Sequence, residues 1–114
     1  MGPAEELEFE PLGDAVLAHL RGEVDLANAR SVRDRLLEAV PNTATGLVLD
    51  LTATHHLDSS GVRVLFELVE RLENRRQKLE IVVPDEAPVR RVLLLTEIDR
   101  VVPLFSSVDA LPRP

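Results

Sequence analysis

A short, almost continuous apolar run limits what this chain can fold into. Residues 47–51 read Leu-Val-Leu-Asp-Leu and lie between Gly46 and Thr52. A run of this length, without the alternation of a half-exposed strand, is typical of a central strand that is covered on both faces. Both faces of such a strand need further elements packed against them, so the run favours a layered α/β fold.

Strand and helix patterns alternate on either side of this run. Apolar stretches bounded by Gly or Pro predict strands, and apolar residues at helical spacing predict helices. The predicted strands cover residues 7–12, 15–20, 47–51 and 79–83, and the predicted helices cover the segment from Asp25 to Pro41, residues 60–74 and residues 89–96. A hairpin turn at residues 12–14 joins the first two strands. The order then continues β-α-β-α-β, which predicts a single-domain α/β fold over residues 1–114, with a mixed β-sheet and helices packed on it.

Caps and apolar stripes add detail to this prediction. Asp25 is interpreted as the N-cap of the first helix, with Leu26 opening its buried stripe. Glu67 and Arg71 should form an i,i+4 ion pair on the second helix. Near the end of the chain, a short apolar piece at residues 101–102 precedes a capping-box pattern at residues 106–109. The second helix should bury a stripe made by Val62, Leu65, Phe66, Val69 and Leu72.

Charge and aromatic content argue against two classes of partner. The 114 residues include 13 Lys+Arg against 20 Asp+Glu, a net charge of −7. This is the wrong sign for neutralising nucleic-acid phosphates or binding an anionic membrane. With three Phe, no Tyr and no Trp, the chain also lacks the aromatics on which single-stranded bases stack. We therefore expect neither a nucleic-acid partner nor a membrane partner.

Targeting signals and cysteine usage point to the cytoplasm. The first ten residues are acidic and lack the basic and apolar regions of a signal peptide. No apolar run approaches the length of a membrane span. The absence of cysteine fits a reducing compartment and excludes thiolate metal sites and cysteine nucleophiles. We expect a cytoplasmic protein.

Three connecting segments should meet at the carboxyl edge of the sheet, where open α/β sheets usually bind ligands. They are residues 22–28, 52–61 and 84–88. The second contains Asp58-Ser59-Ser60-Gly61, directly before the amphipathic helix. Unpaired N–H groups at a helix start favour an anion, so a serine there could carry a phosphate, and Gly61 would let another chain approach closely.

Other interpretations of the polar residues are weaker. Asp50 could suggest a phospho-aspartate site, but the chain has too few βα units, and its one lysine opens a strand. His55 and His56 would point to opposite sides of an extended segment, which disfavours a shared metal. A hydrolytic triad of Ser59, His56 and Asp25 would lack the G-x-S-x-G elbow. Asp25 itself could cap the first helix, contact a partner, or do both.

Taken together, the motifs resemble the STAS domain of the anti-sigma-factor-antagonist type. Arg21-Gly22-Glu23-Val24-Asp25-Leu26 is similar to that family's G-E-[LV]-D element before its first helix. The strand at residues 48–50, followed by Leu57-Asp58-Ser59-Ser60-Gly61-Val62, is similar to its strand and D-S-[ST]-G phosphorylation loop. The third helix and the tail extend the likeness, which covers about residues 8–111. The chain departs from the family at residues 74–76 and 96–99, where many relatives carry Gly; Asn74 could supply the left-handed conformation at the first position.

The resemblance implies a non-catalytic partner switch without metal or cofactor. By resemblance Ser59 is the phosphoacceptor. The unphosphorylated protein would bind an anti-sigma factor that is also a GHKL-type serine kinase, and so release the sigma factor. Phosphorylation would end this binding, and a PP2C-type phosphatase would restore it. The partner surface is expected to comprise Gly22, Asp25, Asn28, Asp58, Ser60, Gly61 and Val62. The alternative is a STAS module that is not phosphorylated and binds a nucleotide, a lipid or transport partner, or a scaffold.

Overall fold

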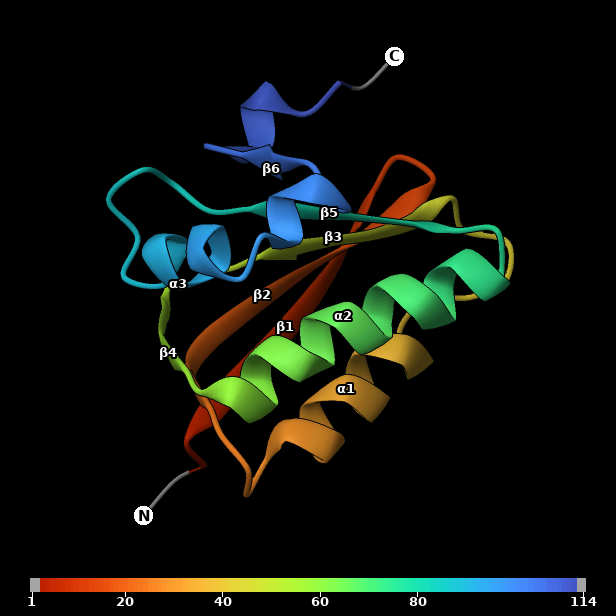
Figure 1. Cartoon of the computed structure of the whole chain (residues 1–114). Helices are drawn as coiled ribbons and strands as arrows, with labels where there is room; N and C mark the ends of the chain where they lie inside the picture. The colour runs from red at the N-terminus through yellow and green to blue at the C-terminus, as the bar shows by residue number, and fades with distance from the viewer. Residues whose placement is uncertain (1–2, 113–114) are drawn as a thin grey trace.

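The computed structural model describes residues 3–112, and this part of the chain forms six strands and three α-helices (Figure 1). In chain order the elements are β1 (Glu5–Leu12), β2 (Ala15–Val24), α1 (Ala29–Glu38), β3 (Gly46–Asp50), β4 (Thr54–Leu57), α2 (Ser59–Asn74), β5 (Lys78–Val82), α3 (Arg90–Leu95), a 3₁₀ turn (Ile98–Arg100), β6 (Leu104–Phe105) and a second 3₁₀ turn (Val108–Ala110). The predicted α/β fold with a single mixed sheet is confirmed.

The sheet is built around β2. Its strand order is β1-β2-β3-β5-β6, with β1 antiparallel to β2 through the predicted hairpin and the other neighbours parallel. The fourth strand, β4, pairs with β2 beyond the point where β3 ends. Since β1 occupies the other side of β2, β3 and β4 follow one another along the same side. The chain therefore leaves the sheet at the end of β3, returns as β4, and enters α2 one residue later.

The two faces of the sheet are covered differently. Helices α1 and α2 lie side by side on one face (Figure 1), and α3 with the 3₁₀ turn after it contributes to the same core. On the other face a smaller cluster forms where the C-terminal segment, through Phe105, Val108 and Leu111, packs near Leu17 and Val48. Strand β3 is buried from its first residue to its fourth. The prediction of a central strand covered on both faces is confirmed.

The buried stripe of α2 differs from the predicted one. Val64 and Leu68 are buried, whereas Phe66 is 39% exposed. The helix packs against α1 as well as the sheet, so its buried side is turned toward that neighbour. For the same reason Glu67 pairs with Arg33 of α1 (Oε2–Nη1 3.1 Å), and the predicted pair with Arg71 is wrong.

Strand β4 was not predicted, because Thr-His-His-Leu carries little apolar signal. Its first residue, Thr54, is fully buried, and its hydroxyl donates to the carbonyl oxygen of Leu20 (2.6 Å). The remaining backbone pairs with β2. Tertiary hydrogen bonds therefore make a strand where local propensity does not.

The C-terminal details also differ from the prediction. The short strand β6 comes after residues 101–102, which form a turn. The capping box at residues 106–109 does not form: the 3₁₀ turn begins after Ser107, and no side chain caps it. At residues 74–76, the first of the two segments where the chain departs from the family, the left-handed residue is Arg76 (φ 60°), not Asn74.

Candidate functional site

Two of the three predicted segments meet at the end of β2. Val24 pairs with Leu57 at the end of β4, and the N–H of Asp58 donates to the carbonyl oxygen of Val24 (3.2 Å). The loop from Asp25 and the start of α2 therefore leave the sheet next to each other. The third segment, residues 84–88, follows β5, which pairs with β3 and β6 rather than with β2 or β4.

Ser59 is the first residue of α2, one residue earlier than predicted, and its side chain is exposed. Asp58 is the N-cap: its Oδ1 accepts hydrogen bonds from the N–H groups of Ser60 (2.8 Å) and Gly61 (3.1 Å). Its carbonyl oxygen accepts the first helical bond, from Val62 (3.0 Å). Two of the N–H groups expected to attract an anion are thus already bound by Asp58. The serine hydroxyl is accessible, as expected, but it does not lie beside an empty amide-lined pocket.

The two glycines of the site are needed for packing within the chain. Gly22 has φ 97°, and a Cβ there would lie 2.2 Å from the carbonyl oxygen of Ala4. The register of the β2–β4 pair shifts between Gly22 and Glu23, and the positive φ of Gly22 allows the local bend there. Gly61 is buried, and a Cβ there would meet Leu57 Cδ2 and the carbonyl oxygen of Val24, each at 3.0 Å. Close packing against its own strand ends, rather than the approach of another chain, explains Gly61.

The loop before α1 is held by Asp25 and Asn28. Asp25 Oδ1 accepts from the N–H of Ala27 (2.9 Å), and Asn28 Oδ1 accepts from the N–H of Asp25 (2.9 Å). Asn28 also donates through Nδ2 to the carbonyl oxygen of Glu23 (2.9 Å). The helix begins at Ala29, so the prediction of Asp25 as its N-cap is wrong; the N-cap position is Asn28. Side-chain bonds to nearby backbone compete with helix formation here.

One consequence of this loop is an exposed leucine. Leu26, predicted to open the buried stripe of α1, is 81% exposed. It borders a groove of about 470 Å³ between α1 and α2, on the side where α2 begins. The groove carries three guanidinium groups in a chain whose net charge is negative. Its polar or charged lining residues are Arg30, Arg33, Ser60, Arg63 and Glu67.

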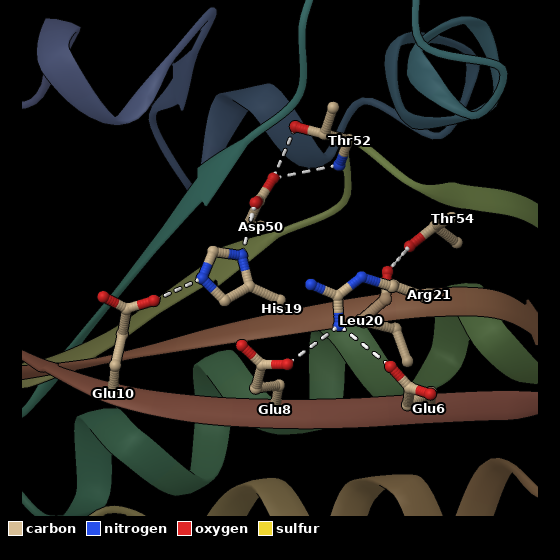
Figure 2. A network of polar contacts seen from close by, with 9 residues as sticks. All are labelled: Glu6, Glu8, Glu10, His19, Leu20, Arg21, Asp50, Thr52 and Thr54. Carbon is tan, nitrogen blue, oxygen red and sulfur yellow. Dashed lines mark hydrogen bonds and ion pairs between the residues drawn. The ribbon is translucent and has the colours of Figure 1, made fainter.

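A second polar network lies on the sheet face opposite α1 and α2 (Figure 2). His19 of β2 bonds through Nδ1 to Asp50 Oδ2 (2.7 Å) and through Nε2 to Glu10 Oε2 (2.8 Å). Asp50 also accepts from the N–H (3.0 Å) and the hydroxyl of Thr52. Beside it, Arg21 pairs with two glutamates of β1. The Asp50 carboxylate is thus occupied within the sheet. Lys78 lies at the start of β5, at the end away from Asp50, so the two do not form the phospho-aspartate site considered above.

The environment shifts both pKa values in this network. Burial lowers the pKa of His19, but the hydrogen bonds and charges of Glu10 and Asp50 outweigh it, so that the pKa is raised above 6.5. Burial raises the pKa of Asp50, but the bonds from Thr52 and His19 leave it below 3.8. Both directions favour the ion pair over the neutral groups.

The alternative chemistries find little support in this geometry. Among residues 3–112, no hydrogen bond joins Ser59 to His56 or Asp25, as a triad would need. No group of three or more potential ligands within that range could hold a metal ion. None of the helices formed by residues 3–112 is both long and apolar enough to cross a membrane.

Comparison with known proteins assigns the family. The model of the STAS domain matches residues 6–111, so the chain belongs to the STAS family. It is 34% identical over 100 residues to the anti-sigma-F factor antagonist RsfB of Mycobacterium tuberculosis, covering 87% of this chain and 80% of that protein. The predicted resemblance to the anti-sigma-factor-antagonist type is confirmed. Members of this type are regulatory binding proteins rather than enzymes.

Solved structures agree with this assignment. An anti-sigma factor antagonist from Mycobacterium paratuberculosis superposes with a TM-score of 0.80 at 26% identity, covering 92% of this chain and 88% of that one. The anti-sigma factor antagonist SpoIIAA in its unphosphorylated form superposes with a TM-score of 0.71 at 18% identity, covering 92% of each chain. The latter match supports the fold alone.

Proposed function

We propose that this antagonist works as a phosphorylation-controlled partner switch. In its unphosphorylated form it binds an anti-sigma factor and thereby releases a sigma factor, and phosphorylation of Ser59 ends the binding. The observation that carries the proposal is the exposed hydroxyl of Ser59 at the first residue of α2, held by the Asp58 cap beside the Asp25 loop.

The chemistry asked of this chain is that of a substrate. A kinase would transfer the γ-phosphoryl group of ATP to Ser59 Oγ; the bond to the ADP oxygen breaks, and the hydroxyl proton passes to a base of the kinase. The chain must present an accessible hydroxyl on a rigid backbone. The Asp58 bonds to Ser60 and Gly61, and the strand bond to Val24, supply that rigidity. By family resemblance the kinase is the anti-sigma factor itself, of the GHKL type, and a PP2C-type phosphatase reverses the step in the cytoplasm.

The proposed contact surface surrounds Ser59. It joins the end of β2, the loop before α1 and the first turn of α2, and Leu26 adds an exposed apolar side chain at its edge. The residues taken to form it are Gly22, Asp25, Asn28, Asp58, Ser60, Gly61 and Val62. Gly22 and the buried Gly61 would act by shaping the backbone.

Charge explains how phosphorylation would end binding. A phosphate on Ser59 adds about −1.5 to −2 charge next to the carboxylate of Asp58 and near that of Asp25. Against a kinase that carries nucleotide phosphates, the added charge repels in a desolvated contact. Each ~1.4 kcal/mol lost weakens binding about tenfold, so a few kcal/mol are enough for a switch.

The test is to incubate the protein with a candidate GHKL-type anti-sigma kinase and ATP, and to map the product by mass spectrometry. We expect one added phosphate, on Ser59. Ser59→Ala should stay bound to the kinase whatever ATP is present, and Ser59→Asp should bind poorly. The matched control is Ser106→Ala, at an exposed serine outside the proposed contact surface, which should be phosphorylated like the wild type. Phosphate on Ser106 with Ser59 unmodified, or full binding by Ser59→Asp, would contradict the proposal.

A second variant tests the contact made by Asp25. Asn at position 25 keeps a side-chain oxygen that can accept from the N–H of Ala27, so the loop should hold. We expect Asp25→Asn to melt like the wild type and to bind the kinase more weakly. Unchanged binding would remove Asp25 from the surface.

A further inference from the structure

An arginine lies one helical turn beyond Ser59 on the same face of α2. Ser59 and Arg63 are four residues apart and both are exposed. Side chains at this spacing are neighbours on a helix surface, with Cβ atoms about 5–6 Å apart. A phosphoserine and an arginine can therefore meet across this turn without any movement of the backbone.

Arg63 has no anionic partner in the part of the chain that the structure describes. The carboxylate four residues further on, Glu67, is bound by Arg33 of α1 (3.1 Å). The first turn of α2 contains no acidic residue. Asp58 directs its Oδ1 at the N–H groups of Ser60 and Gly61. Arg63 thus carries a positive charge that no acidic side chain within residues 3–112 compensates.

A phosphate on Ser59 would need a new partner. An anion at a helix start ordinarily binds the unpaired N–H groups, but Asp58 already occupies those of Ser60 and Gly61. The remaining positive groups nearby are guanidiniums: Arg63 on α2 itself and Arg30 across the groove, with Arg33 already engaged by Asp34 and Glu67. Of these, Arg63 shares the exposed face with Ser59.

We infer that Arg63 is the intramolecular counter-ion of phosphorylated Ser59. The guanidinium binds two phosphate oxygens in its planar fork, and the pair forms along the surface of α2. Phosphorylation then does more than add charge, because it also withdraws a guanidinium from the face that the anti-sigma factor contacts. The Ser59–Arg63 pair changes from a charge of +1 to about −0.5 to −1. This inference rests on the proposed function and names the residue that completes its off state.

The inference is tested on protein carrying phosphoserine incorporated genetically at position 59, so that no kinase is needed. The second ionisation of the phosphate is followed by ³¹P NMR titration in the wild type and in Arg63→Gln. Pairing with Arg63 favours the dianion, so the phosphate pKa should be lower in the wild type by about 0.2–0.7 units, the range of an exposed ion pair. Arg63→Lys keeps the charge but loses the planar fork of the guanidinium, so its phosphate pKa should lie between those of the wild type and Arg63→Gln.

Two controls separate this pairing from general electrostatics. Arg71→Gln removes an exposed guanidinium two turns further along the same helix and should leave the phosphate pKa unchanged. The Nε–Hε signal of Arg63 should move when phosphoserine replaces serine, while that of Arg71 stays. Equal phosphate pKa values in the wild type and Arg63→Gln, or an equal shift in Arg71→Gln, would overturn the inference. Failure of a kinase to modify Ser59 would instead count against the proposed function, so the two failures are distinguishable.

Discussion

Replacing Asp58 with alanine should destabilise the fold through the start of α2. The first N–H groups of a helix lack intrahelical partners, and one oxygen of Asp58 satisfies two of them, on Ser60 and Gly61. Alanine leaves both groups without an acceptor. Asparagine keeps the oxygen and removes only the negative charge, so the pair of variants separates hydrogen bonding from charge.

The expected size follows from these contacts. Loss of an N-cap side chain costs about 0.5–2 kcal/mol. Gly61 is buried, where a lost hydrogen bond is poorly replaced by water, so we expect Asp58→Ala to fall in the upper half of this range. Asp58→Asn should lose about 0.3–1 kcal/mol, the value of a negative charge at a helix start. For a domain of this size, the ~1 kcal/mol between them corresponds to about 4 °C in Tm.

Thermal and denaturant unfolding, followed by circular dichroism, measure this difference. Asp99→Ala is the matched control, because Asp99 is exposed and caps no long helix; it should melt close to the wild type. If Asp58→Ala and Asp58→Asn lost equal stability, the two hydrogen bonds would not be what Asp58 contributes. The bonds from Asp58 would then not be what holds Ser59 in place at the start of α2.

Two further predictions concern the sheet. Glu10 and Asp50 raise the pKa of His19 in the folded state, so the stability that protonated His19 contributes is present below pH 6.5 and is lost as the pH rises through the raised pKa. The free energy of unfolding should fall over this pH interval in the wild type and much less in His19→Gln. An identical fall in both proteins would contradict the prediction. Gly22→Ala should lower the free energy of unfolding in urea by more than about 2 kcal/mol, because the new Cβ combines a positive φ with an overlap with the carbonyl oxygen of Ala4. Gly13→Ala, with φ 59° and nothing within 4 Å of the new Cβ, should cost only about 1 kcal/mol. Equal losses would show that the overlap at Gly22 is relieved.

The sequence predicted the fold well where local pattern and tertiary packing agree. The apolar run of β3 could only be satisfied by burial on both faces, and it is buried so. The start of α2 was predicted to within one residue, because Asp58 precedes an amphipathic pattern and has the chemistry of a cap. The helical pattern of α1 was likewise recognisable, but its first turn was not.

The errors fall where a hydrogen bond distant in sequence, or a competing local one, decides the conformation. Leu26 fits the helical stripe, yet the bonds of Asp25 and Asn28 to nearby backbone hold it outside the helix. At the end of α2, the N–H of Gln77 donates to Leu72 and that of Arg76 to Glu73, a pattern that needs its left-handed residue at Arg76. Asn74 is the better residue for that conformation, but it lies two positions too early.

The dual position of Asp58 links these structural details to the proposed switch. Asp58 lies directly before Ser59, the proposed phosphoacceptor, so on charge alone its carboxylate disfavours a phosphate there. It is also what fixes the first turn, and in doing so it occupies the N–H groups that would otherwise bind that phosphate. In the proposed switch, the charge added at Ser59 would therefore stay on the surface, where a partner meets it, and would not be bound by these two helix N–H groups. A side chain on the same surface can then hold the phosphate, which is the role proposed for Arg63.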